Sequence, residues 1–345
     1  MIKSIELRNF TAFRSLKAEF VPGLNIVIGE NGTGKTHLIK AAYALTGGNR
    51  SEVPHDEFFQ SRLLGVFKPK TRELYSLYHR NGVGPASIRM DMQGEENDGT
   101  YQVEFDARTK KNLRARAGAN AYEVVKPAVF VPTKEVISFY RGFTTLYDQH
   151  GWEFGFDLTY RDICAQLDGM GIVEEHRDHR VNEVMRDIKS ACGGEFLFRG
   201  SGVTFKPTGD KNEFPVNLMA EGFRKLGVLY RLLETQAIRP RFTEVLFLDE
   251  PETNMNPKLM ELVANVLLTL SRNGQQVILA THDYVLVKWF EVLRQQGDAV
   301  RYHALYRTEA GVVQTSTADT YLQLEEKANP IFEAYGKLLD RELGL

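Results

Sequence analysis

Eight consecutive residues near the amino terminus have the composition of a phosphate-binding loop. They read Gly-Glu-Asn-Gly-Thr-Gly-Lys-Thr over 29–36, after the apolar stretch 24–28 and before a helical pattern in 35–45. Glycines let backbone N–H groups face phosphates, and the helix N-terminus that follows favours negative charge. In this pattern the lysine binds the β- and γ-phosphates and the final hydroxyl binds Mg²⁺. The residues predicted to contact the nucleotide are Gly29, Glu30, Asn31, Gly32, Thr33, Gly34, Lys35, Thr36 and His37.

Two carboxylates follow an apolar run in the second half of the chain. Residues 245–248 read Val-Leu-Phe-Leu and lead into Asp249 and Glu250. Such a run is typical of a buried parallel strand, and α/β sheets hold their ligands at the carboxyl ends of their strands. We therefore expect Asp249 to bind Mg²⁺ and Glu250 to act as the general base on the attacking water. A solvated acidic turn is the alternative, and the phosphate loop makes it the weaker one.

A histidine and a glycine-containing helix start complete the set of candidates. His282 directly follows the mostly apolar stretch 276–281, which is the next predicted strand after the acidic pair. In this position it can contact a γ-phosphate. The alternative is that it caps the helix that follows. Segment 217–227 opens another helix, in which Gly222 permits close backbone approach and Arg224 adds charge near an N-terminus that favours anions. An ordinary amphipathic helix start is the alternative for that segment.

The elements that must position these residues alternate between strand and helix. Segment 216–345 shows strands near 243–248 and 276–280 separated by helical patterns, which predicts a parallel sheet wrapped by helices. The earlier segments differ. Apolar and polar residues alternate, as in antiparallel strands, in 72–80, 86–92 and 100–106. Apolar residues recur at helical spacing in 134–192. We therefore predict an α/β fold with an antiparallel β insertion and a short helical arm, divided into 1–133, 134–215 and 216–345.

Composition limits the classes of function. The chain has 345 residues and only two cysteines, too few for a disulfide framework, so a reducing cytoplasm is expected. Its net charge of −2 predicts no general attraction to nucleic acid. Without 18 consecutive apolar residues, no membrane span is expected. A local basic run at 108–116 is either a solvated loop or part of a nucleic-acid surface; its charged residues are Arg108, Lys110, Lys111, Arg114 and Arg116.

Taken in order, these motifs resemble the ABC-type ATPases, in particular their SMC/RecF/OLD-like branch. An N-terminal strand of the type IxxLxxxNFxxF belongs to the same resemblance, and the segment Ile5-Glu6-Leu7-Arg8-Asn9-Phe10-Thr11-Ala12-Phe13 carries its NFxxF ending. It implies a P-loop ATPase head that binds ATP and Mg²⁺, with a signature motif at Ala220, Glu221 and Gly222 that contacts the γ-phosphate held by a second copy. It also implies a D-loop at 252–257, including Asn256, that crosses the dimer interface, and a switch histidine at His282.

Some residues depart from the family pattern. Ala220 and Glu221 stand where the family has a Ser-Gly pair, which predicts slow or partner-dependent hydrolysis. The Q-loop glutamine has no assigned counterpart, Gln60 being a weak candidate, and the segment 134–215 is too short for a long coiled coil.

The motif sequences look most like stand-alone ATPases of bacterial anti-phage and toxin-like operons. That resemblance implies a homodimer or higher oligomer that controls a separate effector, such as a TOPRIM-type nuclease. A RecF/SMC-like DNA-binding repair ATPase is the alternative function. A transporter motor fits less well because the signature motif is degenerate. A P-loop kinase or GTPase fits less well because of the strand that ends in His282.

Overall fold

The computed structural model describes most of the chain. The described residues are 1–46, 54–94, 98–108, 113–118, 128–200, 202–243, 245–326, 336–337 and 340–341. Two members of the basic run, Lys110 and Lys111, lie outside them. Among the described residues, no helix combines the length and the apolar character needed to cross a membrane.

A six-stranded sheet forms the centre of the molecule. Its strand order is β14 (Val313–Ala318), β13 (Val300–Arg307), β3 (Leu24–Gly29), β12 (Val277–Thr281), β11 (Leu246–Asp249) and β7 (Val129–Val131). All neighbours are parallel except β13 and β14, which are antiparallel. Every residue of β3, β11 and β12 is buried, as expected for strands covered on both faces. The predicted parallel sheet wrapped by helices is confirmed.

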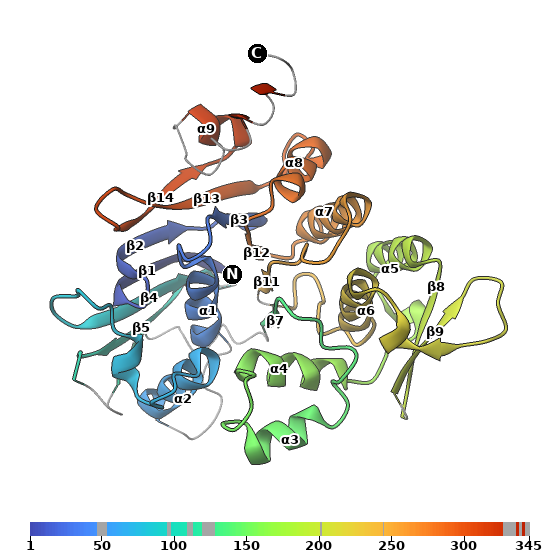
Figure 1. The fold of residues 1–345 in the computed structure, drawn as a ribbon, viewed down its shortest axis with the longest axis horizontal. Coiled ribbons are helices and arrows are strands. Elements are labelled where there is room, and N and C mark those ends of the chain that lie inside the picture. The colour runs from blue at the N-terminus through green and yellow to red at the C-terminus, as the bar shows by residue number, and fades with distance from the viewer. Residues whose placement is uncertain are drawn as a thin grey trace.

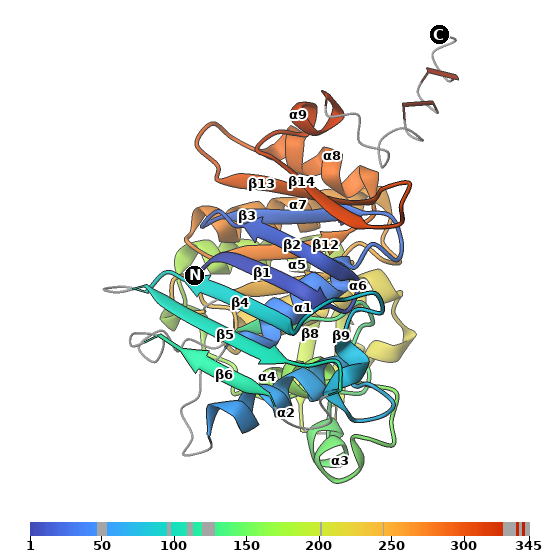
Figure 2. The same ribbon diagram turned by 90° about the vertical axis from the view of Figure 1, so that its left-hand side faces the viewer.

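A second, antiparallel sheet lies beside the first and contains the amino terminus. Its order is β2 (Phe13–Glu19), β1 (Ile2–Phe10), β4 (Ala86–Met92), β5 (Gly99–Phe105) and β6 (Arg114–Ala117). The predicted β insertion therefore extends the N-terminal hairpin into one sheet, as Figure 2 shows. Helix α1 (Lys35–Leu45) packs between the two sheets (Figure 1). Buried Gln276 joins the sheets through both the N–H and the carbonyl of Ile2.

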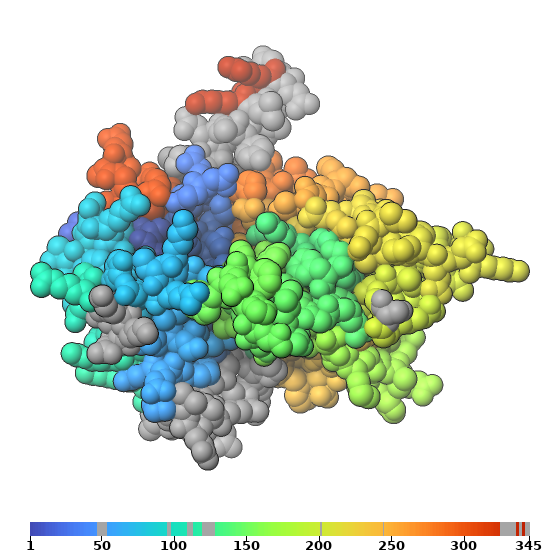
Figure 3. Space-filling view, turned by 60° about the horizontal axis from the view of Figure 1, so that its bottom comes forward, coloured from blue at the N-terminus to red at the C-terminus, as the bar shows by residue number. Residues whose placement is uncertain are grey.

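Helices cover the opposite face of the central sheet. They are α6 (Glu221–Glu234), α7 (Pro257–Arg272) and α8 (Tyr284–Leu293), with α3 (Phe143–His150), α4 (Leu158–Leu167) and α5 (His179–Cys192) outside them. Helix α5 buries Val181, Val184, Met185 and Ile188 against this core. Figure 3 shows the green α3–α4 surface continuous with its neighbours, so the helical segment is a packed lobe and not a projecting arm.

The structure corrects the sequence prediction in several places. Segment 72–80, predicted as a strand, holds a 3₁₀ turn, η1 (Leu74–Leu77), because Leu74 and Leu77 point into the core at a spacing of three. Helix α2 (His55–Phe67) was not predicted, although Phe59, Leu63 and Val66 have helical spacing. The remaining elements are η2 (Glu174–His176), η3 (Val216–Leu218), α9 (Tyr321–Glu326) and a small sheet of β8 (Gly194–Arg199), β9 (Gly202–Pro207) and β10 (Phe214–Pro215).

A buried carboxyl group joins the loop after β11 to the end of β12. Glu252 is 3% exposed, and its Oε1 accepts a hydrogen bond from the Thr281 hydroxyl at 2.6 Å. The other carboxyl oxygen, Oε2, has no partner among the described residues. Burial raises the pKa of Glu252 from 4.5 to about 7, despite the hydrogen bond from Thr281. The folded state therefore favours the protonated form of this side chain.

We predict that Glu252 makes the protein less stable as pH rises. A folded pKa above the unfolded value means that the stabilisation is complete below pH 4.5 and is lost as pH increases to about 7. This shift corresponds to roughly 3 kcal/mol of unfolding free energy. Glu252→Gln keeps an acceptor oxygen for Thr281 and cannot ionise, so its stability relative to wild type should be higher at pH 8 than at pH 5. Denaturant unfolding at both values measures the difference.

The exposed Glu309→Gln is the matched control, and its stability difference from wild type should be the same at both pH values. An equal pH dependence of Glu252→Gln and wild type would contradict a neutral, buried Glu252.

Candidate nucleotide site

The phosphate loop joins the end of β3 to the start of α1. Gly34 has φ of 96°, and a Cβ there would lie 2.6 Å from Cζ of Phe13, so both the backbone and the space require glycine. Gly29 is as confined, because a Cβ would lie 2.5 Å from the carbonyl oxygen of Leu305. The Lys35 ammonium donates to the carbonyls of Gly29 at 2.7 Å and Glu30 at 3.2 Å. It is therefore held within the curve of the loop, and burial lowers its pKa.

Three oxygen-bearing side chains meet beside this loop. The Thr36 hydroxyl donates to Oδ1 of Asp249 at 2.8 Å, and the Thr133 hydroxyl donates to Oδ2 at 3.0 Å. Burial raises the pKa of Asp249, and these two hydrogen bonds oppose the shift. Mg²⁺ prefers oxygen ligands and in nucleotide sites takes only one or two from side chains, the rest coming from phosphates and water. Thr36 and Asp249 therefore fit the predicted metal.

The second acidic residue lies next to the predicted switch histidine. Nδ1 of His282 is 2.9 Å from Oε1 of Glu250, and both side chains remain partly exposed to solvent. Glu250 has φ of 48°, in the left-handed region that a non-glycine residue adopts at a cost. Its N–H donates to Ala280 on β12, which fixes this conformation. The structure thus brings Glu250 and His282 together at the carboxyl ends of β11 and β12.

The signature segment packs on the D-loop of the same chain. Gly222 is buried, and a Cβ there would lie 3.0 Å from the carbonyl oxygen of Asn254. Ala220 is exposed at the start of α6, and Glu221 beside it is partly exposed. Arg224 pairs with Glu135 at 3.3 Å. The close approach that Gly222 permits is therefore intramolecular, and the contact of this segment with a second copy's phosphate stays a prediction.

Two further predicted residues have local structural contacts. The Asn256 side chain caps α7 by accepting from the N–H of Leu259 at 3.0 Å. The exposed His37 ring meets Phe67 edge-on, 5.7 Å between ring centroids. Gln60 lies on α2 in a hollow whose lining contains no phosphate-loop residue, so the structure does not place this glutamine at the nucleotide site.

Sequence reasoning missed two residues at the site. Thr133 follows β7, which pairs with β11, and so reaches the carboxylate of Asp249, the predicted metal ligand. Arg307 ends β13 and donates to the Gly32 carbonyl at 2.6 Å, at the apex of the phosphate loop. Neither belongs to a motif, since only strand order brings them there. The apolar Ala128–Val131 stretch before Thr133 was the available signal.

Two family models match the chain, one over its first part and one over its second part. A model described as "AAA domain" matches residues 4–145, and one described as "AAA domain, putative AbiEii toxin, Type IV TA system" matches 137–288. Together they span the phosphate loop, the acidic pair and the switch histidine. The first match ends and the second begins around the start of α3, where the two overlap over 137–145.

Curated relatives match short segments of the chain. The DNA replication and repair protein RecF of Heliobacterium modesticaldum is 47% identical over 47 residues, which is 14% of this chain and 13% of the relative. RecF of Pediococcus pentosaceus is 31% identical over 96 residues, 27% of this chain and 24% of the relative. The chain therefore matches less than a quarter of the length of these proteins.

Solved structures of SMC head domains resemble the whole chain. The SMC head bound to the C-winged helix domain of ScpA has a TM-score of 0.61 at 14% identity, covering 94% of this chain and 99% of that one. The SMC head domain from Thermotoga maritima has a TM-score of 0.52 at 14% identity, covering 92% and 99%. These likenesses concern the fold. Fold, motif order and family models together support an SMC/RecF-like ATPase of the ABC type.

Proposed function

We propose that the protein binds ATP with Mg²⁺ and hydrolyses it to ADP and phosphate. The observation that carries the proposal is the pair of Glu250 and His282, 2.9 Å apart, beside the Thr36–Asp249 contact. A general base and a phosphate-sensing side chain are thus adjacent to the predicted metal ligands. Bound Mg²⁺ would neutralise charge on the β- and γ-phosphates at Thr36 and Asp249.

Each side chain has a separate task in this proposal. The phosphate-loop N–H groups and the Lys35 ammonium hold the phosphates. The Glu250 carboxylate accepts a proton from the attacking water, and its left-handed backbone keeps it directed at the end of the sheet. His282 orients Glu250 and donates a hydrogen bond toward the γ-phosphate. Thr133 supports the orientation of Asp249 through its second oxygen.

We infer that two copies close head to tail around ATP. The surface before α6 is exposed and partly apolar: Leu218 is 75% exposed, and Ala220 is exposed beside it. An N-terminal turn that presents N–H groups at such a surface suits an anion carried by another molecule. The signature of one copy would then face the phosphate loop of the other, and hydrolysis would reopen the pair.

The closed dimer would act as a switch for a partner effector. The family model over 137–288 names a putative toxin of a toxin–antitoxin system, which supports a role in bacterial defence. In this proposal the effector is a separate protein such as a TOPRIM-type nuclease. The short RecF matches favour a second candidate, a DNA-binding repair ATPase. In that case Arg114 and Arg116 on β6, with Arg108 before it, would contribute to the nucleic-acid surface.

We predict that Glu250→Gln binds ATP with near wild-type affinity and hydrolyses it about 100-fold or more slowly, because only the proton acceptor is lost. The ATP-bound dimer should accumulate in this variant. Lys35→Ala, in contrast, should lose ATP binding. Equilibrium binding, phosphate release and light scattering with ATP measure the three properties. Unchanged turnover in Glu250→Gln would exclude its assignment as the base.

Ala220→Trp tests the shared site, since the exposed position tolerates a large side chain without disturbing the chain's own phosphate loop. We expect this variant to bind ATP but neither dimerise nor hydrolyse it. Mixed with Lys35→Ala, it should recover about a quarter of wild-type turnover, because each mixed dimer has one intact site and one with both lesions. The absence of any recovery on mixing, with both proteins folded, counts against a two-subunit site.

We predict that the purified protein has ATPase activity and no nuclease activity of its own. The described residues hold no group of three or more His, Cys, Asp or Glu side chains placed to bind a metal ion. Labelled DNA and RNA incubated with Mg²⁺ or Mn²⁺ should stay intact. Cleavage that persists in Lys35→Ala would place a nuclease within this chain. ATP turnover stimulated by DNA, and reduced by Arg114→Glu with Arg116→Glu, would favour the repair alternative.

A further inference from the structure

A second pocket lies at the opposite end of the central sheet from the phosphate loop. It has a volume of about 670 Å³ and is lined by 175–181 at the start of α5, Leu233 of α6, residues of 236–242 before β11, and Asn273 at the end of α7. Segment 236–242 and Asn273 precede β11 and β12, so the pocket is at the amino ends of the strands whose carboxyl ends carry Asp249 and His282. The pocket is thus separate from the ATP site.

Positive charge predominates in the lining of this pocket. Four arginines face two carboxylates there: Arg177, Arg180, Arg239 and Arg241 against Glu175 and Asp178. The Asp178 carboxylate accepts from the N–H of Arg180 as the cap of α5. Arg177 donates to Oδ1 of Asn182 and to the Ile172 carbonyl, which are uncharged acceptors and leave its positive charge in place. The N-terminal turn of α5, a 14-residue helix, adds to the preference for an anion.

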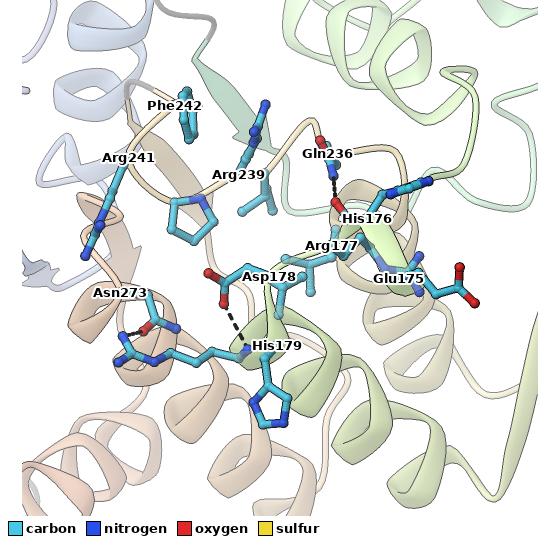
Figure 4. Close-up of a pocket in the computed structure, with 15 residues that line it drawn as sticks. Glu175, His176, Arg177, Asp178, His179, Gln236, Arg239, Arg241, Phe242 and Asn273 are labelled. Atoms are coloured by element: carbon cyan, nitrogen blue, oxygen red, sulfur yellow. Dashed lines mark hydrogen bonds between the residues drawn. The ribbon is translucent and has the colours of Figure 1, made fainter. Parts of the chain in front are cut away.

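A buried amide group in this pocket lacks an acceptor. Asn273 is 8% exposed, and its Oδ1 accepts from Nη1 of Arg180 at 2.6 Å. That contact fixes the amide orientation, and its Nδ2 group has no partner among the described residues. Figure 4 shows the Asn273 nitrogen directed toward the middle of the pocket. Because buried polar groups are normally hydrogen-bonded, a donor left in this position indicates a site built for an acceptor oxygen.

An aromatic ring provides a stacking surface on the same pocket. Phe242 is 55% exposed, and the Arg239 guanidinium lies over its ring at 3.9 Å from the centroid. Paired arginine and aromatic side chains of this kind stack well against nucleobases. The volume is within the range of small-ligand sites. Phosphate donors and a base-stacking group therefore occur in one cavity.

We propose that this pocket binds a nucleoside monophosphate unit, either as a free nucleotide or as the 5′-terminal nucleotide of a single strand. Arg180, the Asn273 amide and the start of α5 hold the phosphate. Phe242 and Arg239 hold the base. The site would let a second ligand report to the ATPase through α7 and β11, which lead from this pocket to the D-loop and the acidic pair.

The test is a titration of fluorescently labelled AMP in the Lys35→Ala background, which removes the phosphate-loop lysine. Saturable binding is expected, weakened at least about 10-fold by Arg180→Ala. Asn273→Asp should abolish binding, because it replaces the amide donor with a negative charge that repels phosphate. The remaining carboxylate oxygen still accepts the hydrogen bond from Arg180, so that contact is kept. Phe242→Ala should weaken binding of AMP but not competition by inorganic phosphate. Arg14→Ala, which removes an exposed arginine of β2, is the matched control and should bind as its parent does.

Competition distinguishes the two sources of the ligand. Stronger competition by a 5′-phosphorylated ten-nucleotide strand than by the same strand with a 5′-hydroxyl identifies a strand end, and competition by AMP alone identifies a free nucleotide. Unfolding temperatures equal to the parent show that the variants are folded. The proposal is overturned if neither AMP nor the phosphorylated strand binds at millimolar concentration, or if Asn273→Asp binds as tightly as its parent. Either result leaves the ATP site untouched, since ATP binding is measured separately in the chain with Lys35 intact.

Discussion

The hydrogen bond between the Thr36 hydroxyl and Asp249 joins two residues 213 positions apart in sequence. It forms only if β3 and β11 end at the same edge of one parallel sheet, with β12 between them. The phosphate loop begins where β3 ends, the acidic pair where β11 ends, and His282 where β12 ends. The whole site is therefore a consequence of strand order, and any displacement of one strand along its neighbours would separate its parts.

Tight packing around the loop explains why the strands cannot shift. Helix α1 is buried between the two sheets, and its first turn is fixed by the contact of Gly34 with Phe13 of the antiparallel sheet. Gln276 links β1 to the start of β12 through two hydrogen bonds. The N-terminal sheet is thus part of the support for the nucleotide site. The left-handed backbone of Glu250 persists because this framework determines it from several sides.

The helical lobe connects the two ends of the central sheet. Asp162 of α4 accepts from Tyr43 of α1 and pairs with Arg62 of α2, which ties the lobe to the phosphate-loop side. At the other end, α5 starts at the basic pocket and packs along α6 and α7. A packed lobe in contact with both ends provides a continuous network of side chains through which the two ends could be coupled. Coupling of this kind would give the ATPase a means of responding to a partner or ligand.

The sequence alone determined the elements whose chemistry is local. A phosphate loop needs only a strand, glycines, a lysine and a helix in succession, so residues 29–36 could be read directly, as could the acidic pair at 249–250 and the fully apolar strands around them. The ABC-type head and its SMC/RecF-like branch followed from the order of these motifs. Helix α2 and the 3₁₀ turn at 74–77 were missed, because the apolar spacing in these short segments is compatible with more than one structure.

Tertiary structure decided everything that depends on which distant segments become neighbours. Thr133 and Arg307 belong to no motif, and they reach the site because β7 and β13 take particular places in the sheet. The contact between Glu252, in the predicted D-loop, and Thr281 of β12 likewise forms only in the folded chain. The second pocket depends on tertiary structure even more, since its lining segments share no sequence pattern and meet only where α5, α6, α7 and the chain before β11 converge. The physical reason is that loop and helix propensities act over a few residues, whereas sheet order is set by burial of the whole core.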